Sequence, residues 1–146
     1  LAPQNGTMGY GLPAAIAAKA AHPDRTVVCF AGDGDLQMTI QELGTARQAG
    51  YEPIVLVFDN GMYGTIRAHQ ERNYPGRISG TPIDNPDFVA IAQAYGMHAE
   101  VVRETDAFGP AFVRAIASPT GALLHLHMPA EMLTPWESID QARDRT

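Results

Sequence analysis

The sequence predicts an α/β protein: a doubly wound, mostly parallel sheet with helices on both faces. Short apolar runs alternate with amphipathic segments along the chain, as they do in βαβ units. The first two apolar runs, TVVCFA and PIVLVF, have no polar face, which is typical of strands that helices cover on both sides. Gly, Pro and Asp residues flank both runs and indicate turns at their ends.

The first half of the chain predicts a complete βαβ unit preceded by a helix. We expect helix, strand, helix and strand at residues 12–21, 26–31, 35–49 and 53–58. The first helix is rich in alanine, and the strands are rich in β-branched residues. In the second helix Leu36, Ile40 and Leu43 recur on one face, Asp35 is a suitable N-cap and Gly50 a suitable stop. The crossover should be right-handed.

The second half repeats this alternation less cleanly. We expect helix, strand, helix and strand at residues 86–95, 98–102, 106–117 and 122–128. Residues 69–85 are polar and rich in turn formers, and loops of that length are usually functional or disordered. Within them, ERNYPGR is either a solvated loop or a lid over a substrate. The tail from Leu133 receives no assignment.

Length and charge restrict the classes of function. The 146 residues suit one domain with a proper core, and a formal net charge of −6 argues against a nucleic-acid or anionic-membrane surface. The single cysteine, Cys29, excludes an internal disulfide framework and favours a reducing, cytoplasmic location. No apolar stretch approaches a membrane span. Because the chain begins with Leu1, we expect it to be a piece of a longer polypeptide.

Polar residues follow the first two predicted strands. Asp33 comes directly after the first strand and Asn60 after the second. Parallel neighbouring strands end at the same edge of a sheet, so the two side chains should converge there, where open α/β folds bind ligands. Carboxylate and amide oxygens suit Mg²⁺ or Ca²⁺. Gly32 and Gly34 leave room for phosphates, and a helix beginning near Asp35 offers free N–H groups to an anion.

Each motif has a plainer interpretation when it is taken alone. GDG is common in turns, and DNG is an ordinary turn signature. Their joint position at the ends of two buried strands favours a binding site over two unrelated turns.

Three motifs in this order resemble a known family. GTMGYGLPAAIAAK, GDGDLQMTIQELGTARQAG and DNGMYGT are similar to the C-terminal cofactor domain of thiamine-diphosphate-dependent enzymes, in particular the large subunit of acetolactate synthase and benzoylformate decarboxylase. The resemblance is strong over residues 6–64 and weak after residue 86. It implies that residues 1–146 form a single thiamine-diphosphate-binding domain, the C-terminal part of a longer multidomain enzyme.

The resemblance also implies a set of cofactor ligands. By analogy with the family, the side chains of Asp33 and Asn60 and the backbone carbonyl of Met62 bind Mg²⁺. Two diphosphate oxygens and a water complete the octahedron that this ion requires. Backbone N–H groups hold the diphosphate at Gly34, Asp35, Tyr63 and Gly64.

Further positions correspond to the organic part of the cofactor and to the substrate. Met8 matches the bulky residue that bends the cofactor, and the carbonyl of Gly6 matches the acceptor for its 4′-amino group. Ile66 and His69 are candidate substrate contacts. The chain departs from the family at Asp59, where many members have Asn. A second departure is His69, where acetolactate synthases carry a tryptophan, and this one leaves the substrate open.

The implied function is that of a 2-oxo acid decarboxylase or carboligase resembling acetolactate synthase. Thiamine diphosphate then acts as the electron sink after decarboxylation. The family's cofactor-activating glutamate lies in an N-terminal pyrimidine-binding domain, normally of the partner subunit. We therefore expect a homodimer or tetramer, and no turnover by this chain alone. The alternative is a non-catalytic or regulatory thiamine-diphosphate-binding module. Pyruvate, an aromatic oxo acid and a sulfur-bearing aldehyde precursor all stay open as substrates.

Three other features favour a structural role. GYGLPA fits the dinucleotide fingerprint, but no strand precedes it, so close helix packing explains its small residues better. His125 and His127 should share one face of a strand, where a metal pair lacks an evident third ligand. Cys29 lies inside an apolar strand and should be an inert core residue.

Overall fold

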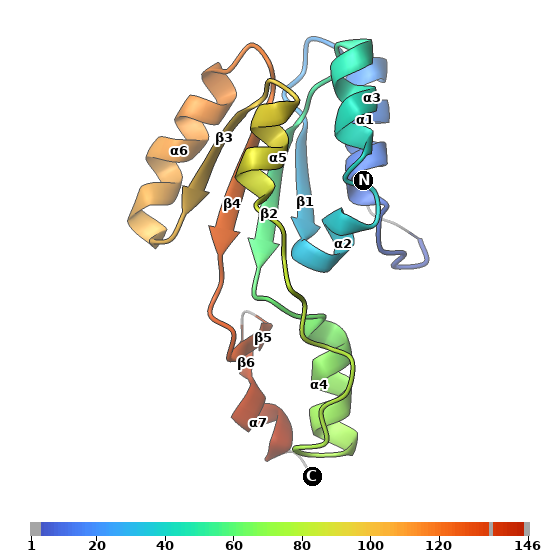
Figure 1. Ribbon diagram of the computed structural model, residues 1–146, viewed down its shortest axis with the longest axis vertical. Coiled ribbons are helices and arrows are strands. Elements are labelled where there is room, and N and C mark those ends of the chain that lie inside the picture. The colour runs from blue at the N-terminus through green and yellow to red at the C-terminus, as the bar shows by residue number, and fades with distance from the viewer. Residues whose placement is uncertain (1–3, 135, 145–146) are drawn as a thin grey trace.

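The computed structural model describes residues 4–134 and 136–144. Its centre is a four-stranded sheet in the order β1-β2-β4-β3, in which every neighbouring pair is parallel. The strands are β1 (Val28–Gly32), β2 (Ile54–Asp59), β3 (His98–Val102) and β4 (Ala122–His127). All four arrows in Figure 1 point toward the same end of the molecule. The predicted α/β class with a parallel sheet is confirmed.

Helices lie on both faces of the sheet. The first core cluster joins one face to α1 (Gly11–Ala21), α2 (Asp33–Gln37), α3 (Glu42–Ala49) and α5 (Phe88–Ala94). The second joins the other face to α6 (Thr105–Ala117). Val55 and Leu123 are fully buried against the first group, as Leu56 and Leu124 are against the second. Within the described ranges, no helix has both the length and the apolar character needed to cross a bilayer.

The helix predicted over residues 35–49 is divided in two. It begins at Asp33, with Gly32 rather than Asp35 as N-cap, and it stops at Gln37 before α3 starts. The turn between them contains Thr39 and Ile40, whose β-branched side chains disfavour a helix. The Thr39 hydroxyl also donates a 3.0 Å hydrogen bond to the carbonyl of Gly9. Gly50 ends α3 with φ +71°, as predicted.

A second group of elements lies beyond the carboxyl ends of the strands (Figure 1). It comprises α4 (Gly64–Asn73), β5 (Met132–Thr134), β6 (Glu137–Ser138) and α7 (Ile139–Arg143). Ala68, Leu133 and Ala142 form its small buried core. Residues 69–73, which the sequence predicts to be the start of a long loop, are therefore helical. The tail from Leu133 onward, for which the sequence predicts no element, forms an antiparallel strand pair and a capped helix.

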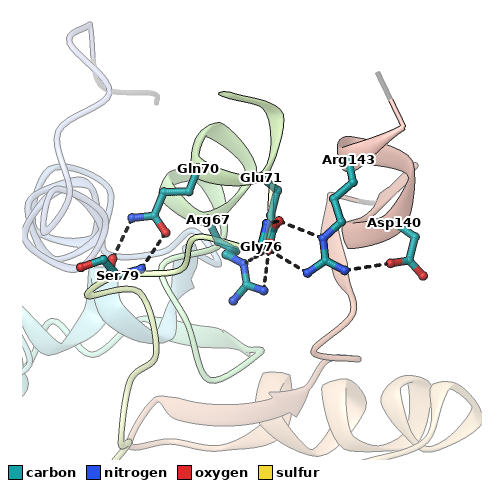
Figure 2. A network of polar contacts seen from close by, with 7 residues as sticks. All are labelled: Arg67, Gln70, Glu71, Gly76, Ser79, Asp140 and Arg143. Carbon is teal, nitrogen blue, oxygen red and sulfur yellow. Dashed lines mark hydrogen bonds and ion pairs between the residues drawn. The ribbon is translucent and has the colours of Figure 1, made fainter. Parts of the chain in front are cut away.

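A buried carboxylate holds this group together (Figure 2). Glu71 of α4 is 1% exposed and accepts hydrogen bonds from Arg67 at 2.7 Å and from Arg143 of α7 at 2.9 and 3.1 Å. Its second oxygen also accepts the N–H of Gly76 at 2.9 Å. The loop after α4 is thus folded back onto the helix, and α7 is fixed to the same residue.

Glu71→Gln is expected to lower the free energy of unfolding by about 1–3 kcal/mol near neutral pH, because it removes the buried carboxylate that Arg67 and Arg143 share. Hydrogen bonds from Arg143 and Gly76 lower the pKa of the Glu71 carboxyl from its ordinary 4.5 to about 2. Stability from a lowered pKa is present above the ordinary value and is lost as the pH falls toward the folded value. Denaturant unfolding should show the two proteins converging between about pH 4.5 and 2.

Asp140→Asn is the matched control for this comparison. Asp140 also pairs with Arg143, at 3.2 Å, but its side chain is 86% exposed. The control should change stability by less than about 0.5 kcal/mol. If the unfolding free energies of wild type and Glu71→Gln differ as much at pH 2 as at pH 7, the charge of the Glu71 carboxylate contributes nothing to stability.

Candidate functional site

The ends of β1 and β2 lie side by side at the edge of the sheet that faces α4. Gly32 is opposite Phe58 in the register, so Asp33 follows β1 at the level where β2 ends in Asp59. The N–H of Gly61 donates to the Asp33 carboxylate at 3.0 Å. The fold thus brings Asp33 into direct contact with the turn that contains Asn60.

Asp33 is a buried carboxylate that accepts hydrogen bonds from neutral donors. These donors are the backbone N–H groups of Gly34 and Gly61 and the amide of Asn85. Burial raises the pKa of this carboxyl, and the neighbouring Asp59 adds to the rise, against the lowering effect of the Asn85 and Gly34 hydrogen bonds. A buried negative charge without a cationic partner is costly, and a bound cation would offset that cost.

Asp59 has a different environment, although it lies beside Asp33. Its Oδ2 is 2.6 Å from Nε2 of His125 on β4, and its Oδ1 accepts the Gly61 N–H at 2.9 Å. Burial by itself would raise the pKa of Asp59. Hydrogen bonds with the side chains of His125 and Asp33 and with the backbone N–H of Gly61 lower it. The ring of His125 also meets Phe88 edge-on, with centroids 5.2 Å apart. His125 thus supports Asp59 from within the core.

The turn after β2 positions the other two predicted metal ligands. Asn60 Oδ1 accepts the N–H of Met62 at 3.3 Å. Met62 pairs with Pro82 in an isolated antiparallel bridge, whose hydrogen bonds run from Tyr63 N to Thr81 O and from Ile83 N to Gly61 O. Neither bond uses the carbonyl oxygen of Met62, which leaves it able to coordinate a cation.

The candidate metal ligands at this edge are a carboxylate, a side-chain amide oxygen and a backbone carbonyl oxygen. In the described part of the chain, no three His, Cys, Asp or Glu side chains gather closely enough to hold a metal ion. A cation at this edge therefore needs amide and backbone oxygens and further ligands from a bound molecule. Hard oxygen ligands completed by phosphate and water are the environment that Mg²⁺ prefers.

A cavity of about 200 Å³ opens beside Asp33. It is lined by Met8, by residues 32–35 and by residues 62–66, which include the first turn of α4. A Cβ atom at Gly34 would lie only 2.4 Å from the Tyr63 ring and 2.8 Å from Ile83. A side chain at this position therefore does not fit. The backbone N–H of Tyr63, expected from the resemblance to hold a diphosphate, donates instead to the Thr81 carbonyl at 2.9 Å. Gly64, the first residue of α4, lines the cavity.

The GTMG segment is tied to α2 beside this cavity. The Asp35 carboxylate accepts the N–H of Gly9, and the Thr39 hydroxyl donates to the Gly9 carbonyl. Asp35 thus anchors this segment instead of capping the helix. Met8 lines both the small cavity and a larger groove of about 890 Å³ along α1 and β1, which also contains Gly6. Met8 is therefore brought into the cavity that Asp33 lines, and Gly6 lies in the adjoining groove.

Ile66 and His69 lie on the exposed side of α4, three residues apart and hence neighbours on the helix surface. Ile66 lines the small cavity, and the opposite side of α4 buries Arg67 and Glu71. The two candidate substrate contacts thus lie on the same exposed side of α4, and Ile66 on that side lines the cavity. In the part of the chain that is described, no glutamate lines the cavity.

The remaining sequence features have structural roles. A Cβ atom at Gly11 would lie 3.2 Å from the Cys29 sulfur, which supports close helix packing as the explanation of GYGLPA. Burial raises the pKa of Cys29 to about 11, as expected of an inert core thiol. The rings of His125 and His127 lie 4.5 Å apart on one face of β4, as predicted, and His125 pairs with Asp59.

Fold and site together define an α/β domain with a small cavity beside the buried Asp33, at the carboxyl ends of the strands of a parallel sheet. A family model for the C-terminal TPP binding domain of thiamine pyrophosphate enzymes matches residues 2–126, and the chain belongs to this family.

Individual relatives agree with the family assignment. The chain is 39% identical over 122 residues to the acetolactate synthase isozyme 2 large subunit of Escherichia coli, covering 83% of this chain and 22% of the relative. It is 46% identical over 101 residues to the acetolactate synthase of Arthrospira platensis, covering 68% and 17%. A thiamine diphosphate-dependent 4-hydroxybenzoylformate decarboxylase of Rhodococcus jostii RHA1 superposes with a TM-score of 0.80 at 32% identity, covering 87% and 24%. The chain thus spans only a minor part of the length of each of these relatives.

Proposed function

We propose that this chain binds thiamine diphosphate through Mg²⁺ as the cofactor domain of a larger 2-oxo acid decarboxylase or carboligase. The observation that carries the proposal is the contact between Asp33 and the turn containing Asn60 beside a cavity with no space for a Cβ atom at Gly34. The relatives are named as acetolactate synthases and as a thiamine diphosphate-dependent decarboxylase, which supports this reaction class.

The residues present fit a magnesium diphosphate. Asp33 would supply a buried, negatively charged oxygen, whose charge the Mg²⁺ ion would balance. Asn60 and the backbone carbonyl of Met62 would supply neutral oxygens. The backbone N–H of Gly64 would offer a hydrogen bond to an anion in the cavity, whereas the N–H of Gly34 donates to Asp33 Oδ1 at 2.9 Å. Thiamine diphosphate, when bound, supplies the electron sink that decarboxylation of a 2-oxo acid requires.

The other residues have roles in orientation and exclusion. Met8 stands between the small cavity and the groove that contains Gly6, where it would hold the cofactor in a bent form. Ile66 and His69 would face the substrate from α4. The cofactor-activating glutamate would come from an N-terminal pyrimidine-binding domain of the same or a partner subunit, which makes a homodimer or tetramer the expected assembly. We also propose a cytoplasmic location, because the single cysteine fits a reducing compartment.

An activity screen of the full-length protein tests this function. Purified protein is incubated with Mg²⁺, thiamine diphosphate and a panel of aliphatic and aromatic 2-oxo acids, and CO₂ release is measured. We expect consumption of at least one acid that depends on both the metal and the cofactor. Cofactor binding without turnover of any acid would favour the non-catalytic module, and the absence of binding would overturn the proposal.

A further inference from the structure

Asn85 occupies a bridging position between the two acidic residues at the edge of the sheet. It lies in the loop between α4 and α5, and its side-chain nitrogen is 2.7 Å from Asp33 Oδ2 and 2.8 Å from Asp59 Oδ1. Its side-chain oxygen accepts a 2.7 Å hydrogen bond from the Gln37 amide. Ionised carboxylates only accept hydrogen bonds, so the NH₂ group of Asn85 must face them and its oxygen must face Gln37.

A second donor bridges the same two oxygens. The N–H of Gly61 is 3.0 Å from Asp33 Oδ2 and 2.9 Å from Asp59 Oδ1. These two oxygens are thus held between Asn85 on one side and the backbone after Asn60 on the other. Two neighbouring carboxylates repel each other in a buried site, and the donors between them keep them in place.

This arrangement distinguishes the two oxygens of Asp33. Its Oδ2 is committed to Asn85 and Gly61, whereas its Oδ1, among the described residues, accepts the N–H of Gly34 within its own turn. Oδ1 is therefore the oxygen with capacity left for a cation. A side chain that fixes Oδ2 fixes the direction of Oδ1 as well, because the carboxylate is a rigid planar group.

We propose that Asn85 is a positioning residue for the metal site, which holds Asp33 Oδ2 beside Asp59 so that Oδ1 faces the cation. This inference rests on the proposed function. Partners that orient a metal ligand typically account for about 10–100-fold in metal affinity. The loop before α5 thereby becomes part of the cofactor site, although Asn85 itself lines neither cavity.

Asn85→Ala is expected to raise the Mg²⁺ concentration for half-maximal thiamine diphosphate binding by about 10–100-fold. Binding is measured by calorimetric titration of the full-length protein, together with thermal unfolding of the protein without metal or cofactor. Asn73→Ala is the matched control, because Asn73 is an exposed asparagine whose amide donates to the His69 carbonyl, within its own helix. A change of less than twofold in Asn85→Ala, or lower thermal stability with unchanged Mg²⁺ dependence, would overturn the inference.

Asn85→Asp separates positioning from simple electrostatics. It keeps the size of the side chain but replaces a donor with an acceptor. An extra negative charge near a cation site should strengthen Mg²⁺ binding if charge alone matters, whereas loss of the bridge should weaken it. We expect weaker binding. The double variant Asp59→Asn/Asn85→Asp restores the original charge but still leaves an acceptor facing Asp33 Oδ2, so its binding should stay weak. Tighter binding by the single variant, or full recovery by the double variant, would contradict the role.

Asp33→Ala, measured in the same titrations, separates this inference from the function on which it rests. If Asp33→Ala abolishes metal-dependent binding while Asn85→Ala leaves it unchanged, the positioning role is wrong and the metal site stands. If Asp33→Ala binds as tightly as wild type, the proposed metal site itself is wrong.

Discussion

Replacing Asp33 with alanine should abolish magnesium-dependent binding of thiamine diphosphate, with affinity reduced by more than about 100-fold. Asp33 is the charged member of the proposed ligand set, and the other protein ligands, Asn60 and the Met62 carbonyl, are neutral. Titration of the full-length protein with cofactor at several Mg²⁺ concentrations measures the effect. Asn60→Ala should act in the same direction, because it removes a second oxygen ligand from the same ion.

The fold should survive the Asp33→Ala substitution. The variant leaves the N–H of Gly61 and the amide of Asn85 with one acceptor fewer, which costs about 1–3 kcal/mol, but it also removes the buried member of two adjacent carboxylates. Cooperative thermal unfolding should therefore persist. Asp24→Ala, at an exposed turn near the opposite edge of the sheet, should leave both binding and stability unchanged. Normal binding by Asp33→Ala would refute the metal assignment.

Adding one methyl group at Gly34 should have the second largest effect. In Gly34→Ala the new Cβ atom would lie 2.4 Å from Cε1 of Tyr63 and 2.8 Å from Cδ1 of Ile83. Tyr63 immediately precedes α4, so its displacement would shift the helix turn that lines the cavity. We expect a loss of about 1–3 kcal/mol in unfolding free energy from overpacking, and cofactor binding weaker by about 10–100-fold.

Gly109→Ala is the matched control for the Gly34 substitution. Gly109 lies within α6, and a Cβ atom there would meet no atom within 4 Å. Alanine is the better helix former, so this variant should be neutral or more stable by up to about 1 kcal/mol, with unchanged cofactor binding. Equal behaviour of the two variants in unfolding and in titration would show that the close approach at Gly34 has no consequence.

The parts of the fold that follow local sequence patterns were predictable. The β2 run lacks polar residues because both of its faces are covered, and its parallel pairing with β1 places Asp33 beside the turn after β2. The expectation of two covered faces is wrong for β1, an edge strand whose Phe30 side chain is 67% exposed. The whole of helix α4 was missed, because it buries the Arg67–Glu71 ion pair instead of an apolar stripe. Its hydrophobic pattern therefore carries no helical signal.

The supporting residues of the site were beyond the reach of sequence patterns. Asn85 is 52 residues from Asp33 and 26 from Asp59, and only the path of the loop after α4 brings it to them. Its position just before Pro86 and the N-cap Asp87 indicates a helix start and nothing more. The sequence predicts a structural role for His125, and its 2.6 Å contact with Asp59 shows how it supports the edge of the sheet. Long-range polar contacts of this kind leave no local pattern.

A crystal structure of the full-length protein with thiamine diphosphate and Mn²⁺ in place of Mg²⁺ tests the central claim most directly. The anomalous signal of Mn²⁺ locates the ion independently of any assumed ligand. We predict one peak about 2.0–2.3 Å from Asp33 Oδ1 and from the side-chain oxygen of Asn60, with the Met62 carbonyl and the diphosphate also bound to it. A peak that touches neither side chain, or only one of them, would contradict the claim that these two strand ends hold the cofactor's metal.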